Sequence, residues 1–157
     1  MSIIDNNASK GMPSLTTSFG TSKSMMPKVL LVTLCTDHLI KTTGSGTYTD
    51  DVFELPALNN LGPMVKRIRV HLNVESATTN FRSRVGFAWS MLGRVWSTPS
   101  NLIVDVVGDT TSTIGTWFED ETKFGLHLRA SVGASNNSGS AIESGRVTAI
   151  LEIELKS

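Results

Sequence analysis

The clearest pattern in the chain is an alternation of apolar and polar side chains between residues 65 and 96. Every second residue from Ile68 to Val74 is apolar, and the residues between them are charged or polar. This period of two is typical of a β-strand with one buried face. After a polar interruption at residues 75–80 the alternation resumes, so we expect two long strands that are joined by a short turn and pair antiparallel. The expected inward positions of the second strand are Phe81, Val85, Phe87, Trp89 and Met91.

Six further segments are rich in apolar and β-branched residues and have the length of strands. Turn-forming residues separate them, and residues 133–144 are expected to form a long flexible loop. The eight strands predict an all-β fold, an antiparallel two-sheet sandwich. The jelly roll is the commonest eight-stranded arrangement of this kind, and an immunoglobulin-like sandwich is the main alternative. The six segments are residues 28–40, 47–55, 102–107, 114–118, 123–132 and 145–156.

Residues 1–27 differ from the rest of the chain, because their few apolar side chains are scattered among Ser, Thr, Asn and Gly. Such a segment cannot close a core of its own. We therefore expect an extended N-terminal arm over residues 1–27 and a jelly-roll β-sandwich domain over residues 28–157.

The composition excludes several classes of protein. The 157 residues suffice for one domain with its own core. The 14 basic and 14 acidic residues cancel, which argues against a domain that coats nucleic acid through its overall charge. Cys35 is the single cysteine, so no internal disulfide forms and we expect a buried thiol. No run approaches the roughly 20 apolar residues of a spanning helix, so we expect a soluble chain without a membrane span.

The order of these elements, a polar arm followed by eight strands of which the last ends the chain, resembles the single jelly-roll coat proteins of small icosahedral viruses and phages. The resemblance covers most of the chain and rests on its layout. The arm departs from many RNA-packaging coats, because Lys10 and Lys23 are its only basic residues.

The resemblance implies a structural protein that is not an enzyme and needs no cofactor. Its partners would be other copies of itself and other particle proteins, with slight contact to nucleic acid. It would be located in the virion, after assembly in the host cytoplasm. With the strands named B to I, the fold gathers the B–C, D–E, F–G and H–I connections at one end. These polar connections are residues 42–46, 75–80, 108–112 and 133–144.

Four arginines on the central strand pair take the outward parity, and we expect them to form one basic face beside the turn. Such a face is solvated, paired within the chain, or matched by an external counter-charge, so these residues are candidate contacts to another subunit or to phosphate. They are Arg67, Arg69, Arg82 and Arg84.

Five acidic residues lie between residues 97 and 122, a stretch without Lys or Arg. They form a candidate acidic contact or a weak cation site, although their spacing matches no calcium loop and an exposed acidic turn is the simpler interpretation. They are Asp105, Asp109, Glu119, Asp120 and Glu121.

Two other functions remain open from the sequence. A carbohydrate-binding β-sandwich module would use Trp96 or Trp117 to stack on sugars, and this is the main alternative. An enzyme with a carboxylate site in the acidic segment is the least supported interpretation. Outside that segment, Glu152 and Glu154 share a strand face as a glycosidase pair would, but they have the pattern of a solvated face. The sequence also contains no nucleophile elbow.

Overall fold

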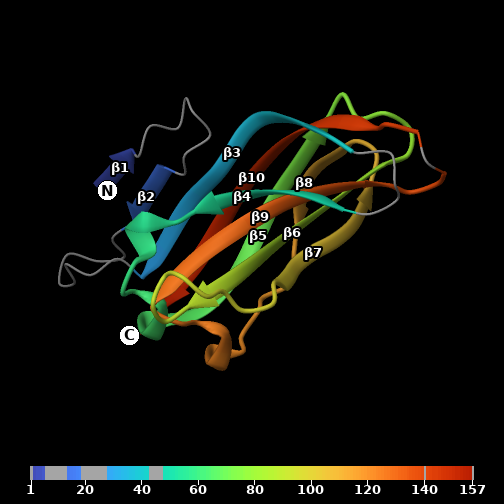
Figure 1. Ribbon diagram of the computed structural model, residues 1–157. Helices are drawn as coiled ribbons and strands as arrows, with labels where there is room; N and C mark the ends of the chain where they lie inside the picture. Colours follow the sequence, from blue (N-terminus) through green and yellow to red (C-terminus); the bar gives the residue numbers. More distant parts are fainter. Residues whose placement is uncertain (1, 6–13, 19–27, 43–47, 140, 157) are drawn as a thin grey trace.

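The computed structural model describes residues 2–5, 14–18, 28–42, 48–139 and 141–156. Within these residues the fold is all-β, with ten strands and three short 3-10 helices (Figure 1). The strands are β1 (Ser2–Asp5), β2 (Ser14–Ser18), β3 (Val29–Lys41), β4 (Thr49–Glu54), β5 (Val65–Glu75), β6 (Phe81–Ser90), β7 (Ser100–Val107), β8 (Thr110–Ile114), β9 (His127–Asn136) and β10 (Ser144–Leu155). The 3-10 helices are η2 (Pro56–Leu58), η3 (Gly62–Met64) and η4 (Glu121–Lys123).

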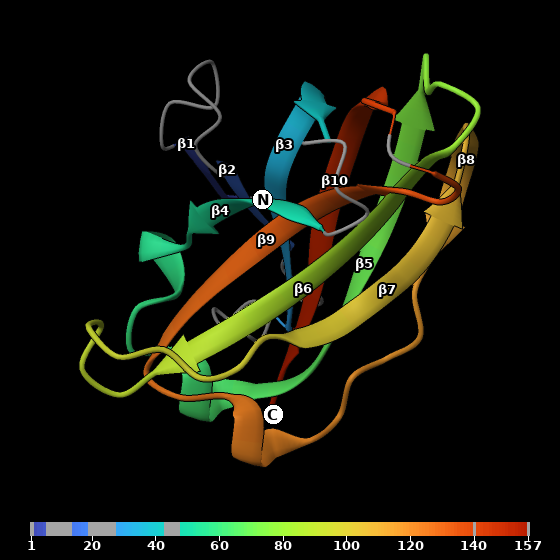
Figure 2. The same ribbon diagram turned by 45° about the vertical axis from the view of Figure 1, so that its right-hand side comes forward.

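The strands form two antiparallel sheets that face each other (Figure 2). One sheet has the order β1-β2-β3-β10-β5-β8, and the other has the order β4-β9-β6-β7. With β3 to β10 named B to I, the two sheets contain the orders B-I-D-G and C-H-E-F. This is the jelly-roll arrangement, so the fold class expected from the alternating pattern is confirmed.

The core lies between the sheets and is built by the alternation itself. In β10 every second residue from Val147 to Leu155 is buried, and β5 shows the same period from Ile68 to Val74. An aromatic cluster closes one end of the core, where the ring of Phe87 lies 5.0 Å from that of Phe118. Each fully buried large apolar side chain contributes about 1.5–3 kcal/mol to folding, so the side chains that this alternation buries supply most of the stability.

The expected pairing of the central strands is wrong. The strand β5 pairs with β10 and β8, whereas β6 pairs with β9 and β7. The turn at residues 76–80 carries the chain from one sheet to the other, so the two strands face each other across the core. Alternation defines which side of a strand meets the core but not which strand lies beside it, and both arrangements bury the same side chains.

Three boundaries also differ from the expectation. The strand expected at residues 114–118 is instead β8 at Thr110–Ile114, which begins inside the expected turn 108–112, because its Thr-rich segment pairs with β5. The loop expected at residues 133–144 begins only after Asn136, because small residues at the end of β9 pair with β6. Met91, an expected inward residue, is 53% exposed.

The described part of the N-terminal segment extends the larger sheet. The strand β2 pairs with β3, and β1 pairs with β2. Residues 6–13 and 19–27 of the expected arm lie outside the described residues. The division between an arm and a domain at residues 27 and 28 therefore stays a prediction.

Candidate functional site

The outer face of the six-stranded sheet carries a network of cross-strand ion pairs. Arg69 on β5 donates two hydrogen bonds to Glu152 on β10, at 2.5 and 3.2 Å. Arg67 on β5 donates a hydrogen bond to Glu154 on β10 at 2.7 Å and a second one to Glu119 at 3.3 Å. Both arginines are therefore engaged by carboxylates of their own chain.

The ring of a tryptophan packs against this network. The guanidinium carbons of Arg67 and Arg69 lie 4.1 and 4.3 Å from the ring centroid of Trp117, within the range of cation–π attraction. Trp117 lies in the connection between β8 and β9, so the contact fastens this connection to the face of β5.

The network shifts the ionisation of its members. Hydrogen bonds from Arg69 and then His71 lower the pKa of Glu152, against the opposing effect of burial. Hydrogen bonds from Arg67 and Lys66 lower the pKa of Glu154 in the same way. The pKa of Arg67 is raised, mainly by its bond to Glu154. The charged forms are thus the stable forms, and the face holds them in pairs.

The other two arginines lie on the opposite outer face. Arg84 on β6 bonds Asp50 on β4 at 2.7 Å, and its guanidinium carbon lies 3.9 Å from the ring centroid of Tyr48. Arg82 donates a hydrogen bond to Ser135 at 2.8 Å. The expected single basic face is therefore wrong, because β5 and β6 belong to different sheets. The outward direction of the side chains is as expected, and their role in contacts stays a prediction.

The acidic residues are dispersed over separate contacts. Asp109 accepts a hydrogen bond from the backbone N–H of Ala77, and the carboxylate of Asp120 caps η4. Glu119 pairs with Arg67, and Glu121 pairs with Lys156 at 3.0 Å. Asp105 lies on β7, and its side chain is outside the described part of the structure.

Among the residues that the structure describes, no three His, Cys, Asp or Glu side chains are grouped to hold a metal ion. The acidic residues therefore remain candidates for contacts with other molecules. The described helices include none that is long and apolar enough to cross a membrane.

Polar connections meet at one end of the sandwich and are fastened to each other. Thr78 in the D–E turn exchanges hydrogen bonds with Ser144 at the start of β10, through backbone and hydroxyl groups. The N–H of Asn137 donates to the carbonyl of Asn80, and the N–H of Gly108 donates to the carbonyl of Phe81. The D–E, F–G and H–I connections thus gather as expected, while residues 43–47 of the B–C connection lie outside the described residues.

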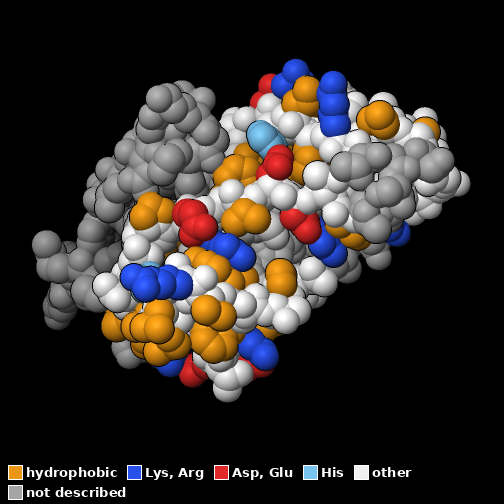
Figure 3. Space-filling model, in the orientation of Figure 1, with side chains coloured by type: hydrophobic (Ala, Val, Ile, Leu, Met, Phe, Trp, Pro, Cys, Tyr) orange, Lys and Arg blue, Asp and Glu red, His pale blue; other side chains and the backbone are white. Residues whose placement is uncertain are grey.

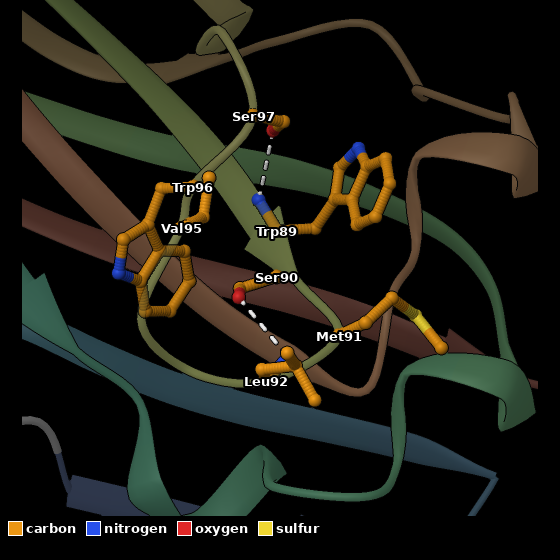
Figure 4. A pocket seen from close by; sticks show the side chains of 7 residues that line it. All are labelled: Trp89, Ser90, Met91, Leu92, Val95, Trp96 and Ser97. Atoms are coloured by element: carbon orange, nitrogen blue, oxygen red, sulfur yellow. Dashed lines mark hydrogen bonds between the residues drawn. The ribbon is translucent and has the colours of Figure 1, made fainter.

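The opposite end carries a feature that the sequence analysis missed. The connection between β6 and β7 presents Leu92, Val95 and Met91 to solvent, with exposures of 79%, 81% and 53%. Their side chains and the indoles of Trp89 and Trp96 surround a hollow of about 310 Å³ (Figure 4). We call residues 91–96 the apolar knob. The apolar residues of this connection are visible in the sequence, but the alternation places Met91 on the inward side of the strand and assigns no surface role to Leu92 and Val95.

Hydrogen bonds at its base give the apolar knob a defined shape. The N–H of Ser97 bonds the carbonyl of Trp89, while the hydroxyl of Ser97 accepts from the N–H of Trp89 (Figure 4). The hydroxyl of Ser90 accepts from the N–H groups of Leu92 and Gly93, at 3.3 and 2.9 Å. Gly93 has a φ of +72°, which favours glycine, so the turn of the knob is specified by its sequence.

Both tryptophans considered for sugar stacking are already engaged. Trp117 lies under Arg67 and Arg69, and Trp96 lies under Arg129, whose guanidinium carbon is 4.3 Å from the ring centroid. Each ring therefore has a face covered by a cation of the same chain, which leaves less aromatic surface for a sugar.

Comparisons with known proteins identify the fold and no family. No family model matches the chain, and no curated protein matches it. Among solved structures, a chain of infectious bursal disease virus, Gx strain, aligns with a TM-score of 0.57 and 12% identity, over 85% of this chain and 33% of that one. The VP2 subviral particle of the same virus aligns with a TM-score of 0.56 and 10% identity, over 84% and 33%.

These likenesses show a shared jelly-roll fold. The chain spans about a third of the length of the viral chains that it matches. A carbohydrate-binding module, solved with beta-1,4-galactotriose, aligns with a TM-score of only 0.38 at 10% identity, over 98% of this chain and 87% of that one. That score is too low to support the carbohydrate-binding alternative.

Proposed function

We propose that the chain is a structural subunit, without enzymatic activity, that assembles with copies of itself into a viral or phage particle. The strand orders B-I-D-G and C-H-E-F carry this proposal. The viral chains that share the fold support it, one of them solved as a subviral particle. In this proposal the protein is a shell, vertex or decoration component and is located in the virion.

The surface supports assembly through protein contacts more than through nucleic acid. Arg67, Arg69 and Arg84 are paired with carboxylates of the same chain, so they offer phosphate little unmatched charge. The apolar knob, in contrast, exposes Leu92 and Val95 without a covering element among the described residues. Exposed apolar groups of this kind mark surfaces that other molecules cover.

The test is the mass of the purified full chain over a range of concentrations and salt, measured by mass photometry with negative-stain electron microscopy. The proposal predicts discrete species of many copies with closed outlines. Because apolar contacts strengthen with salt while surface ion pairs weaken, assembly should persist in high salt. A chain that stays monomeric at every concentration would contradict the proposal.

A further inference from the structure

The apolar knob has one charged side chain, Arg94. Arg94 is exposed and forms no ion pair with any residue in the described part of the chain. The sequence contains no Asp or Glu between Ser76 and Val104. The knob therefore combines two large exposed aliphatic groups with one cation that has no ion-pair partner among the described residues, and its partner should combine an apolar surface with a carboxylate.

The same face of the molecule holds a surface of that kind. A hollow of about 90 Å³ on the four-stranded sheet is lined by apolar and polar groups from β4, β6 and β9, and we call it the β4 hollow. Val52 in this hollow is 50% exposed. The lining residues are Asp50, Val52, Ala88, Pro99, Arg129, Ala130 and Ser131.

The β4 hollow is lined by one carboxylate, Asp50, and one guanidinium, Arg129, and the carboxylate of Glu54 lies beside Arg129. Of the three carboxylates on β4, Asp50 and Glu54 share the outward parity of Val52, whereas Asp51 takes the opposite parity, that of the buried Phe53. Asp50 is paired with Arg84 and Asp51 with His38, both at 2.7 Å. Glu54 differs, because its side chain is 62% exposed and its nearest ion-pair partner, Arg129, lies at 4.0 Å. Glu54 thus keeps most of its capacity to bind a further cation.

The knob and the hollow are neighbours. Pro99 belongs to the same connection as the knob, and Arg129, which lines the hollow, lies over the ring of Trp96. In Figure 3, hydrophobic side chains gather at the end of the face where the β6–β7 connection runs, and acidic and basic side chains lie beside them.

We propose that two copies of this chain associate about a two-fold axis, with the apolar knob of each copy seated in the β4 hollow of the other. This inference rests on the proposed self-assembly and names its contact. Two complementary patches that are adjacent on one face suit a two-fold axis, because the contact between knob and hollow is then formed twice. A contact of knob against knob would place the two Arg94 side chains together, whereas seating in the hollow brings Arg94 of one copy to Glu54 of the other.

The test is charge reversal, read out by sedimentation velocity at several concentrations. Arg94→Glu and Glu54→Lys should each weaken dimer formation by about tenfold or more, and the double variant should restore most of the loss. Leu92→Ser with Val95→Ser should abolish the dimer. Ile142→Ser, which changes an apolar side chain that is 69% exposed in the H–I connection, is the control and should leave the dimer unchanged.

The outcomes separate the contact from the function. If the wild type forms particles and the Leu92→Ser, Val95→Ser variant forms them equally well, the contact is wrong and the proposed function stands. If both charge variants keep their thermal stability and the double variant fails to recover, the Arg94 to Glu54 pairing is wrong. If the wild type never self-associates, both proposals fall. Binding to vesicles of phosphatidylcholine and phosphatidylserine that requires Leu92 and Val95, with self-association unaffected, would replace the second copy by a lipid surface.

Discussion

Arg69 on β5 and Glu152 on β10 lie directly opposite each other and share two hydrogen bonds, at 2.5 and 3.2 Å. The pair joins the two central strands of the B-I-D-G order. Glu152 also accepts a hydrogen bond from the ring Nε2 of His71 at 2.7 Å, so one carboxylate serves two cross-strand partners. The outer face of the larger sheet is therefore held by ionised groups.

The Arg69–Glu152 pair should make the free energy of unfolding depend on pH. The pKa of Glu152 is lowered in the folded state, mainly by Arg69, so its contribution is fully present above the unfolded pKa of about 4.3 and is lost as pH falls through the folded value. Glu152→Gln should reduce the free energy of unfolding by about 1–2 kcal/mol at pH 7. Urea unfolding at pH 7 and pH 3 checks this. The difference from wild type should shrink at pH 3; a difference that grows would contradict the assignment.

Trp117 should couple energetically to the arginines that stack on its ring. A double-mutant cycle of Trp117→Ala and Arg69→Ala, measured by urea unfolding, should give a coupling energy of about 0.5–1 kcal/mol. The cycle of Trp117→Ala with Arg94→Ala is the control and should give none, because Arg94 lies in the apolar knob. Equal coupling in the two cycles would rule out a cation–π contact at Trp117.

Gly62 should tolerate no side chain. A Cβ at this position would lie 1.6 Å from the carbonyl oxygen of Gly125, so two connections cross there at backbone contact. Gly62→Ala should lower the free energy of unfolding by about 3 kcal/mol or more, or prevent folding. Gly108→Ala is the matched control. Its φ is +70° and its Cβ would meet nothing within 4 Å, so the cost should be about 1 kcal/mol. Similar melting temperatures for the two variants would contradict this crossing.

The thiol of Cys35 should be inert in the folded protein. Burial raises its pKa to about 12, and its S–H donates to the carbonyl of Val147 at 3.4 Å. Because the thiolate is the reactive form, iodoacetamide at pH 8 should label the native protein only at the rate of unfolding, and should label it fully in urea. Rapid stoichiometric labelling without urea would show that Cys35 is accessible.

Much of the fold follows from the period of two. The alternation predicted the inward residues of β5 and β10 and the eight-stranded sandwich, because burying one face is the main source of strand stability. It did not predict that β5 and β6 belong to opposite sheets. Neighbour choice depends on how connections cross the core, and the polar turn at residues 76–80 suits both a hairpin and a crossing.

The surface was harder to predict than the core. The alternation correctly predicted that Arg67 and Arg84 point outward. They lie on opposite faces of the sandwich because β5 and β6 belong to different sheets. The apolar knob was missed because Met91 and Val95 continue the apolar character of β6, and sequence alone does not show where a strand ends and its side chains turn to solvent. Pairing of Glu119 with Arg67 likewise depends on the path of the β8–β9 connection.

The most direct measurement of the central claim is electron cryomicroscopy of the full chain at the highest concentration at which it stays in solution. The account predicts closed particles of fixed symmetry, built from copies of the jelly-roll sandwich, with the knob of one copy against a neighbouring copy. Images that contain only single sandwiches, with Leu92 and Val95 facing solvent in each, would contradict it.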